Sequence, residues 1–148
     1  MIYKIALVLI VVLVAFMFYK NNVTPSYIGV ADGQLSPMPS SPNAVSSQTD
    51  VEDKKVAPFT FNSIDDAKKN VKRVFAQLPS NSVELEREDY LHVIFTTETM
   101  KFHDDVELYF DEKNKLIHYR SQSRVGYSDR GLNKARYEQF SELYNGLK

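Results

Sequence analysis

The sequence predicts an α+β domain: an antiparallel β-meander of about four strands with two amphipathic helices, preceded by an N-terminal transmembrane helix. Three observations lead to this prediction. An uninterrupted apolar run opens the chain, segments between residues 83 and 124 alternate apolar and polar side chains, and two further segments place apolar residues at helical spacing.

The apolar run covers residues 5–18, IALVLIVVLVAFMF, and contains no polar side chain. Tyr3-Lys4 and Tyr19-Lys20 flank it, as aromatic and basic residues do at membrane interfaces. At a rise of about 1.5 Å per residue, a helix over residues 2–19 would reach roughly 27 Å, close to a hydrocarbon core about 30 Å thick. We therefore predict an uncleaved anchor. The alternative is a signal peptide, whose small-residue cleavage site would come late, at 29–31.

The distribution of basic residues predicts the orientation of this anchor. Lys4 precedes the apolar run, and after Lys20 no Lys or Arg occurs until Lys54. Because basic residues concentrate on the cytoplasmic side, we expect a single-pass membrane protein with a cytoplasmic N-terminus and a periplasmic or other extracytoplasmic domain. The expected organisation is an anchor over 1–20, a Ser/Pro-rich tether over 21–37 and a domain over 38–148.

Composition excludes several classes of function. The net charge of -1 gives no reason to expect nucleic acid as a partner. The absence of Cys rules out disulfides, thiolate nucleophiles and Cys-ligated zinc. His103, Asp105 and Glu107 alternate along one strand and could offer metal ligands, but charged residues are ordinary on the exposed face of an antiparallel strand. We therefore predict neither a metal nor a cofactor.

The first helix of the domain is predicted to begin after Ser63, which can cap it, with Asp65 and Asp66 at the positive end of its dipole. Pro79 ends it. Its apolar stripe consists of Ile64, Ala67, Val71, Val74, Phe75 and Leu78.

Strands are predicted over 83–86 and 90–97, followed by a hairpin around Lys113-Asn114. If Glu112 faces Lys115, then Leu108 faces Tyr119 on an apolar face, whereas a shift of one residue would mix apolar and polar side chains. In this register Glu107 faces Arg120 on the polar face, where we expect an exposed ion pair.

A second amphipathic helix is predicted over 132–146, with Asp129 or Asn133 as its cap. We expect both helices to cover the apolar face of the sheet. The residues expected to point inward from this helix are Leu132, Ala135, Phe140, Leu143 and Leu147.

Three blocks, SPNAVSS (41–47), DDVELYFDE (104–112) and RSQSRVGYSDRGLNKAR (120–136), together resemble the bacterial and plastid domain-of-unknown-function 1499 family. The resemblance implies a fold and no established activity. It places the end of the tether near Met38, and Ala44 stands where the family often has Cys. The residues that match the family motifs are Pro42, Asn43, Ser46, Ser47, Arg120, Ser121, Ser123, Arg124, Gly126, Ser128, Asp129, Gly131 and Asn133.

Our first hypothesis is a binding or interaction module of the cell envelope. Arg with clustered Ser and Asn near a helix N-terminus is suited to a small anionic or hydroxylated ligand, or to a loop of an envelope protein. The alternative is structural: these polar groups bond one another and hold the Ser-Pro-Asn loop, which satisfies Arg124. The expected pocket is lined by Ser46, Ser47, Arg124, Ser128 and Asn133.

Two further hypotheses remain. A hydrolase would need His92, His103 or His118 to lie beside Ser46, Ser47 or Ser128, but the hairpin register directs His118 toward Tyr109. We therefore favour a binding protein over an enzyme. The other hypothesis is a passive subunit of an envelope membrane complex, held through its anchor helix.

Overall fold

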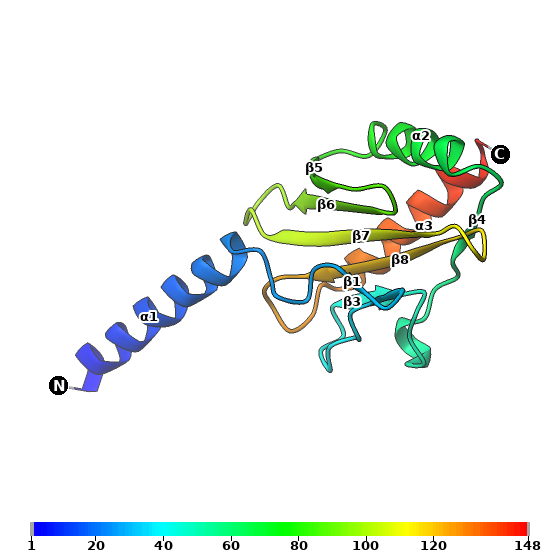
Figure 1. Ribbon diagram of the computed structural model, residues 1–148. Helices are drawn as coiled ribbons and strands as arrows, with labels where there is room; N and C mark the ends of the chain where they lie inside the picture. Colours follow the sequence, from blue (N-terminus) through cyan, green and yellow to red (C-terminus); the bar gives the residue numbers. More distant parts are fainter. Residues whose placement is uncertain (1, 148) are drawn as a thin grey trace.

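Helix α1 (Ile2–Asn22) projects from one end of a domain in which two helices cover one face of a β-sheet (Figure 1). The structure, a computed structural model, describes residues 2–147. Among these residues α1 is the one helix that is long and apolar enough to cross a membrane. Its apolar side chains are exposed rather than packed against the domain.

The expected meander is confirmed. It consists of β5 (Asn81–Glu86), β6 (Tyr90–Thr96), β7 (His103–Asp111) and β8 (Leu116–Ser123), each antiparallel to the next. Two short strands extend it along the free edge of β8. They are β3 (Ala44–Ser46) and β4 (Phe59–Thr60), which pair with opposite ends of that strand.

The hairpin register predicted from the sequence is also confirmed. Glu107 pairs with Arg120 and Leu108 with Tyr119. Alternation then sends Leu108 and Tyr119 to one face of the sheet, where both are fully buried.

The apolar face packs against α2 (Ile64–Phe75) and α3 (Leu132–Asn145). Ser63 caps α2 as predicted, because its Oγ accepts a hydrogen bond from the N–H of Asp66 at 3.4 Å. The core joins both helices to β6, β7, β8 and the two short edge strands. Its fully buried members include Val71, Val74, Val93, Val106, Leu108, Ile117, Tyr119 and Phe140.

The inward face of α3 differs from the prediction. Leu132 and Ala135 are exposed, whereas Asn133 and Arg136 are buried beside Phe140 and Tyr144. The physical reason is that polar residues of β7 and β8 supply hydrogen-bond partners under the first turn of α3. An apolar residue at that place would leave those strand groups without partners.

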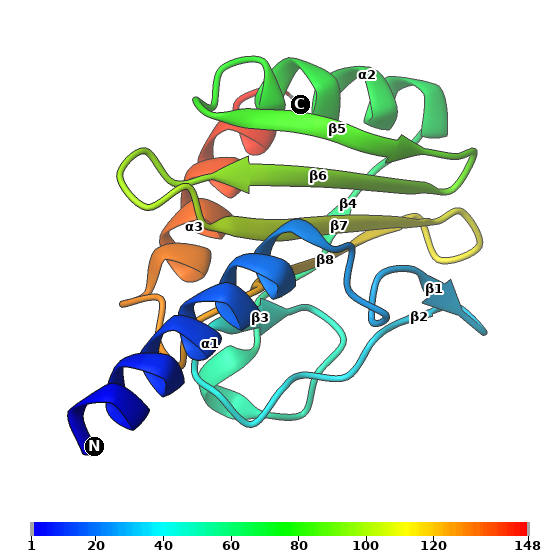
Figure 2. The same cartoon turned by 90° about the vertical axis from the view of Figure 1, so that its left-hand side faces the viewer.

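Residues 21–37 do not form the loose tether that their composition predicted. They run across the other face of the sheet, past β7 and β8, as Figure 2 shows. On the way they form a small ribbon from β1 (Val30–Ala31) and β2 (Gln34–Leu35). The segment is fixed mainly by hydrogen bonds to polar side chains of the sheet, so its low apolar content did not reveal it. The domain boundary at residue 38 stays a prediction.

Candidate functional site

Two buried polar clusters lie on opposite faces of β7 and β8. The first, which we name the outer-face cluster, lies under residues 21–37. It consists of Tyr90, His92, Asp105, Glu107, Arg120 and Arg124, all of which are buried.

Arg124 and Asp105 form one half of the outer-face cluster. Arg124 Nη2 donates to Asp105 Oδ1 at 2.7 Å and Nε donates to Oδ2 at 2.9 Å. His92 Nε2 lies 2.8 Å from the same Oδ1, and the Tyr27 hydroxyl donates to Oδ2 at 3.1 Å. Burial alone would raise the pKa of Asp105, but the hydrogen bonds from His92 and Arg124 outweigh it and hold that pKa below its usual value.

Arg120 and Glu107 form the other half. Arg120 Nη1 donates to Glu107 Oε2 at 2.8 Å, and the Tyr90 hydroxyl donates to Oε1 at 2.6 Å. Residues 21–37, which we name the covering segment, complete this half, since the backbone N–H of Gly29 donates to Glu107 Oε1 at 2.8 Å. The ring of Tyr27 lies 4.5 Å from the Arg120 guanidinium carbon.

The expectation that Glu107 and Arg120 form an exposed pair is therefore wrong. Their side chains are 0% and 1% exposed. The register was correct, but the face that the hairpin turns away from the core is covered by another part of the chain. Loss of one partner destabilises a buried ion pair more than a surface pair, because the remaining charge is neither paired nor hydrated.

His103, Asp105 and Glu107, the residues weighed as metal ligands, each have other partners. His103 Nδ1 lies 2.9 Å from the carbonyl oxygen of Asn21, and the two carboxylates bind Arg124 and Arg120. Within residues 2–147 no group of His, Asp and Glu is arranged to hold a metal ion.

The second cluster, the inner-face cluster, joins β7 and β8 to the start of α3. It consists of Asp104, Ser121, Ser123, Asn133 and Arg136. Arg136 Nη2 donates to Asp104 Oδ2 at 2.7 Å, and Asn133 Nδ2 donates to Ser123 Oγ at 3.0 Å. Ser121 Oγ donates to Asn133 Oδ1. Asp129 accepts the backbone N–H of Asn133 at 2.7 Å, but the cap position of α3 is occupied by Gly131, so the prediction of Asp129 or Asn133 as the cap residue is wrong.

The Ser-Pro-Asn loop packs against the 124–133 turn, which confirms that prediction. Asn43 Nδ2 donates to the carbonyl of Gly126 at 2.8 Å, and Asn133 Nδ2 donates to the carbonyl of Asn43 at 3.0 Å. The expected partner of Arg124 was wrong, however. Arg124 bonds Asp105 and the carbonyl of Asn21 on the outer face, not the Ser-Pro-Asn loop.

The five residues of the expected pocket are not brought together. Arg124 belongs to the outer-face cluster and Asn133 to the inner-face cluster. The three serines each accept a nearby backbone N–H: Ser46 from Gln48, Ser47 from Tyr119 and Ser128 from Arg130. That the thirteen motif residues form a ligand site stays a prediction.

Folding does bring one histidine beside a serine. Ser47 Oγ lies 3.3 Å from His118 Nδ1, while His118 Nε2 lies 3.9 Å from Asp111 Oδ2. Burial lowers the pKa of His118, and Asp111 opposes that shift. Ser47 Oγ already accepts the N–H of Tyr119 at 2.9 Å, and 3.9 Å is too long for a hydrogen bond to the carboxylate. The group lacks the close contacts of a catalytic triad.

A cleft of about 640 Å³ lies where the Ser-Pro-Asn loop meets the 124–133 turn. We name it the motif cleft, because motif residues Pro42, Asp129 and Gly131 line it. Ala44, at the position where the family often has Cys, is 3% exposed and also lines it. The remaining lining residues are Met38, Pro39, Ser40, Val45, Val51, Asp53, Lys54, Tyr127 and Lys134.

Lys54 is the residue of the motif cleft that sequence reasoning missed. It ends the short helix η1 (Glu52–Lys54), is 8% exposed, and donates from Nζ to the carbonyls of Ser41, at 2.8 Å, and of Pro39. Within residues 2–147 it forms no ion pair, although Asp53 and Asp129 also line the cleft. No spacing or motif marks this lysine in the sequence.

Comparison with known proteins agrees with the resemblance seen in the motif blocks. The model of the family described as protein of unknown function (DUF1499) matches residues 34–143. The matched range includes both motif segments that line the cleft and begins after α1 and most of the covering segment. A search of curated proteins found no match. The chain therefore belongs to the family of proteins of unknown function DUF1499.

Proposed function

We propose that this chain is a membrane-anchored extracytoplasmic protein whose domain binds a small anionic, hydroxylated ligand in the motif cleft. The observation that carries the proposal is Lys54. Its side chain is buried at the cleft wall. Within the described residues, its ammonium group donates only to the backbone carbonyls of Pro39 and Ser41.

The chemistry of the cleft wall suits an anion. A buried ammonium group is costly without a counter-charge, and only two of its three N–H groups are used by Pro39 and Ser41. An anionic group in the cleft would supply both the charge and the third acceptor. Lys134 also lines the cleft and adds a second positive charge, which the carboxylate of Asp53 opposes. The carboxylate of Asp129 is bonded to the start of α3.

The neutral part of the wall suits a hydroxylated carbon skeleton. Pro39, Pro42 and Tyr127 present apolar surface, and Ser40 offers a hydroxyl group. Mixed walls of this kind, with a few polar groups, are typical of small-molecule sites.

Contacts of residues 21–29 support retention of the anchor. Cleavage after residues 29–31 would remove Asn21, Tyr27 and Gly29, which bond Arg124, Asp105 and Glu107. Those buried charges would lose partners that the folded domain uses. A reporter that is active only outside the cytoplasm, fused after Lys148, should be active, and the mature chain should keep residue 1.

The ligand can be sought in the protein purified from membranes in mild detergent. Native mass spectrometry should show a bound small anion, and inorganic phosphate and glycerol phosphate serve as titration probes by calorimetry. Lys54→Met should abolish probe binding, because it removes the buried charge. Lys72→Met is the matched control, since Lys72 is an exposed lysine on α2 paired with Glu86.

Equal binding by the parent, the Lys54 variant and the Lys72 variant would refute the cleft as the site. Co-purification of a stoichiometric protein, with no small anion, would favour the passive subunit instead. A hydrolase is the weakest alternative, because Ser47 Oγ is already bonded to Tyr119 and no carboxylate hydrogen-bonds His118 in the described residues.

A further inference from the structure

The end of α1 is fixed to the domain without a flexible linker. Asn21, in its last turn, is 6% exposed. Its side chain donates from Nδ2 to the carbonyl of Lys101 at 2.9 Å and accepts the N–H of His103 at 2.8 Å. Its carbonyl accepts from Arg124 Nη1 at 3.1 Å. Three points on the domain thus hold one residue of the helix, so the helix axis sets the orientation of the domain.

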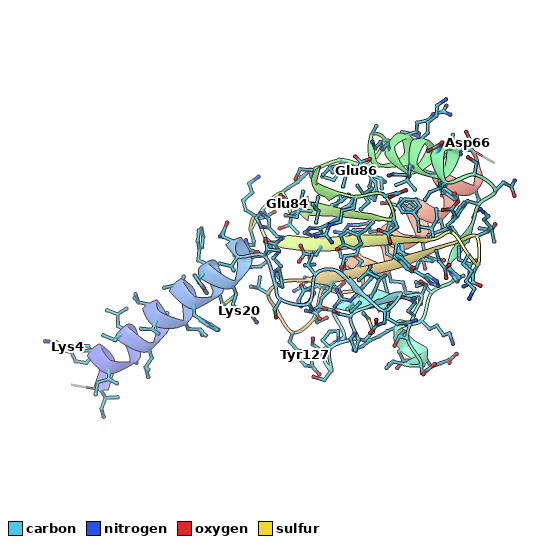
Figure 3. All side chains as sticks on the ribbon, viewed as in Figure 1. Lys4, Lys20, Asp66, Glu84, Glu86 and Tyr127 are labelled. Carbon is cyan, nitrogen blue, oxygen red and sulfur yellow. The ribbon has the colours of Figure 1, made fainter. Side chains whose placement is uncertain are left out.

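Two loops lie at the end of the sheet from which α1 leaves. They are residues 97–102, between β6 and β7, and residues 124–131, between β8 and α3 (Figures 1 and 2). In Figure 2, α1 leans toward the side on which both loops lie. Figure 3 places Tyr127 on the same side of the domain as Lys20, whereas the turn between β7 and β8 lies at the opposite end of the sheet in Figure 1.

The side chains at the tips of these loops suit a lipid interface. Met100 is 63% exposed and Tyr127 is 76% exposed. Lys20, Lys101 and Arg130 form no ion pair within residues 2–147. Tyr concentrates at the headgroup level of membranes, and basic residues there are attracted to anionic lipids.

The acidic residues of the two loops do not cancel this pattern. Asp129 is bonded to the first turn of α3, which leaves Glu98 as the one exposed acid against Lys101 and Arg130. Exposed apolar and aromatic side chains rimmed by basic groups are typical of a surface that contacts lipid.

We propose that residues 97–102 and 124–131 contact the interface of the bilayer that α1 crosses, with Met100 and Tyr127 among the lipid headgroups. The inference rests on the proposed anchoring by α1, and it does not require a ligand in the motif cleft, although Tyr127 also lines that cleft. The domain would then sit on the membrane in one orientation rather than move on a tether.

The absence of Cys makes the full chain suitable for a direct test. Single variants Met100→Cys and Tyr127→Cys are labelled with an environment-sensitive fluorophore and reconstituted into vesicles of phosphatidylcholine and phosphatidylglycerol. Lipids that carry a doxyl quencher near the headgroup report contact. Val12→Cys in α1, tested with a quencher deep in the acyl chain, reports insertion of the anchor. Glu112→Cys, in the exposed turn at the far end, is the control in water.

We expect quenching at residues 100 and 127 and none at residue 112. If residue 12 is quenched while residues 100 and 127 behave like residue 112, the loops do not contact lipid and the inference is wrong, although the anchor stands. If residue 12 is not quenched, the anchoring itself fails and the inference fails with it. Met100 and Tyr127 are exposed, so both variants should fold, which circular dichroism checks.

Discussion

Arg124 donates two parallel hydrogen bonds to Asp105, from Nη2 to Oδ1 at 2.7 Å and from Nε to Oδ2 at 2.9 Å, and both side chains are buried. This fork joins the end of β8 to β7. Through the carbonyl of Asn21, the same guanidinium also holds the last turn of α1. Arg124 therefore links both strands to the end of α1.

Truncation of Arg124 should destabilise the domain strongly. Arg124→Ala leaves the carboxylate of Asp105 buried without its cation, and loss of one partner of such a pair typically costs about 3 to 5 kcal/mol. Denaturant unfolding of the full chain in detergent measures the free energy. The matched control is Lys72→Ala, which breaks an exposed pair with Glu86 and should cost less than about 1 kcal/mol. Similar losses for both variants would show that the Arg124 pair is not buried.

The lowered pKa of Asp105 leads us to predict that the domain loses stability in acid. Its pKa is lowered in the folded state, so its contribution is complete above its unfolded pKa of about 3.9 and disappears as pH falls through the folded pKa. The free energy of unfolding should therefore decrease when the pH is lowered below about 4. Asp105→Asn should be less stable at neutral pH, but its stability should decline less in that acid range. An unchanged acid slope in Asp105→Asn would contradict this assignment.

We predict that residues 23–37 of the covering segment stabilise the domain, because Tyr27 and Gly29 bond buried carboxylates of the sheet. Their replacement by a Gly/Ser linker of equal length should expose the outer-face cluster. The free energy of unfolding should then decrease by several times the contribution of one hydrogen bond, which is about 1 kcal/mol. Hydrogen exchange should show lost protection in β7 and β8.

Two Tyr27 variants separate the contributions within this segment. Tyr27→Phe loses only the hydrogen bond to Asp105, whereas Tyr27→Ala also loses the ring over Arg120. The Ala variant should therefore be the less stable of the two. If the linker replacement unfolds at the same denaturant concentration as the parent, residues 23–37 are a tether after all.

Local sequence patterns determine several structural features of this protein. The apolar run of α1, the Ser63 cap of α2 and the pairing of Glu107 with Arg120 follow from periodicity and neighbouring residues, and the structure agrees with all three in position. The three motif blocks likewise indicated the family. These features depend on residues close in sequence or directly opposite in one hairpin, so the sequence contains the whole pattern.

Only the tertiary structure decided which polar groups are buried and what they bind. Hydropathy shows which side chains avoid water, but a charged residue is buried when a partner arrives from elsewhere in the chain. Tyr27 and Gly29 reach Asp105 and Glu107 from 78 residues away. Lys54 obtains its carbonyl partners, and a place on the motif cleft, from the fold of the preceding loop. The outer face of the sheet is therefore buried because the chain returns over it, which alternation within two strands does not encode.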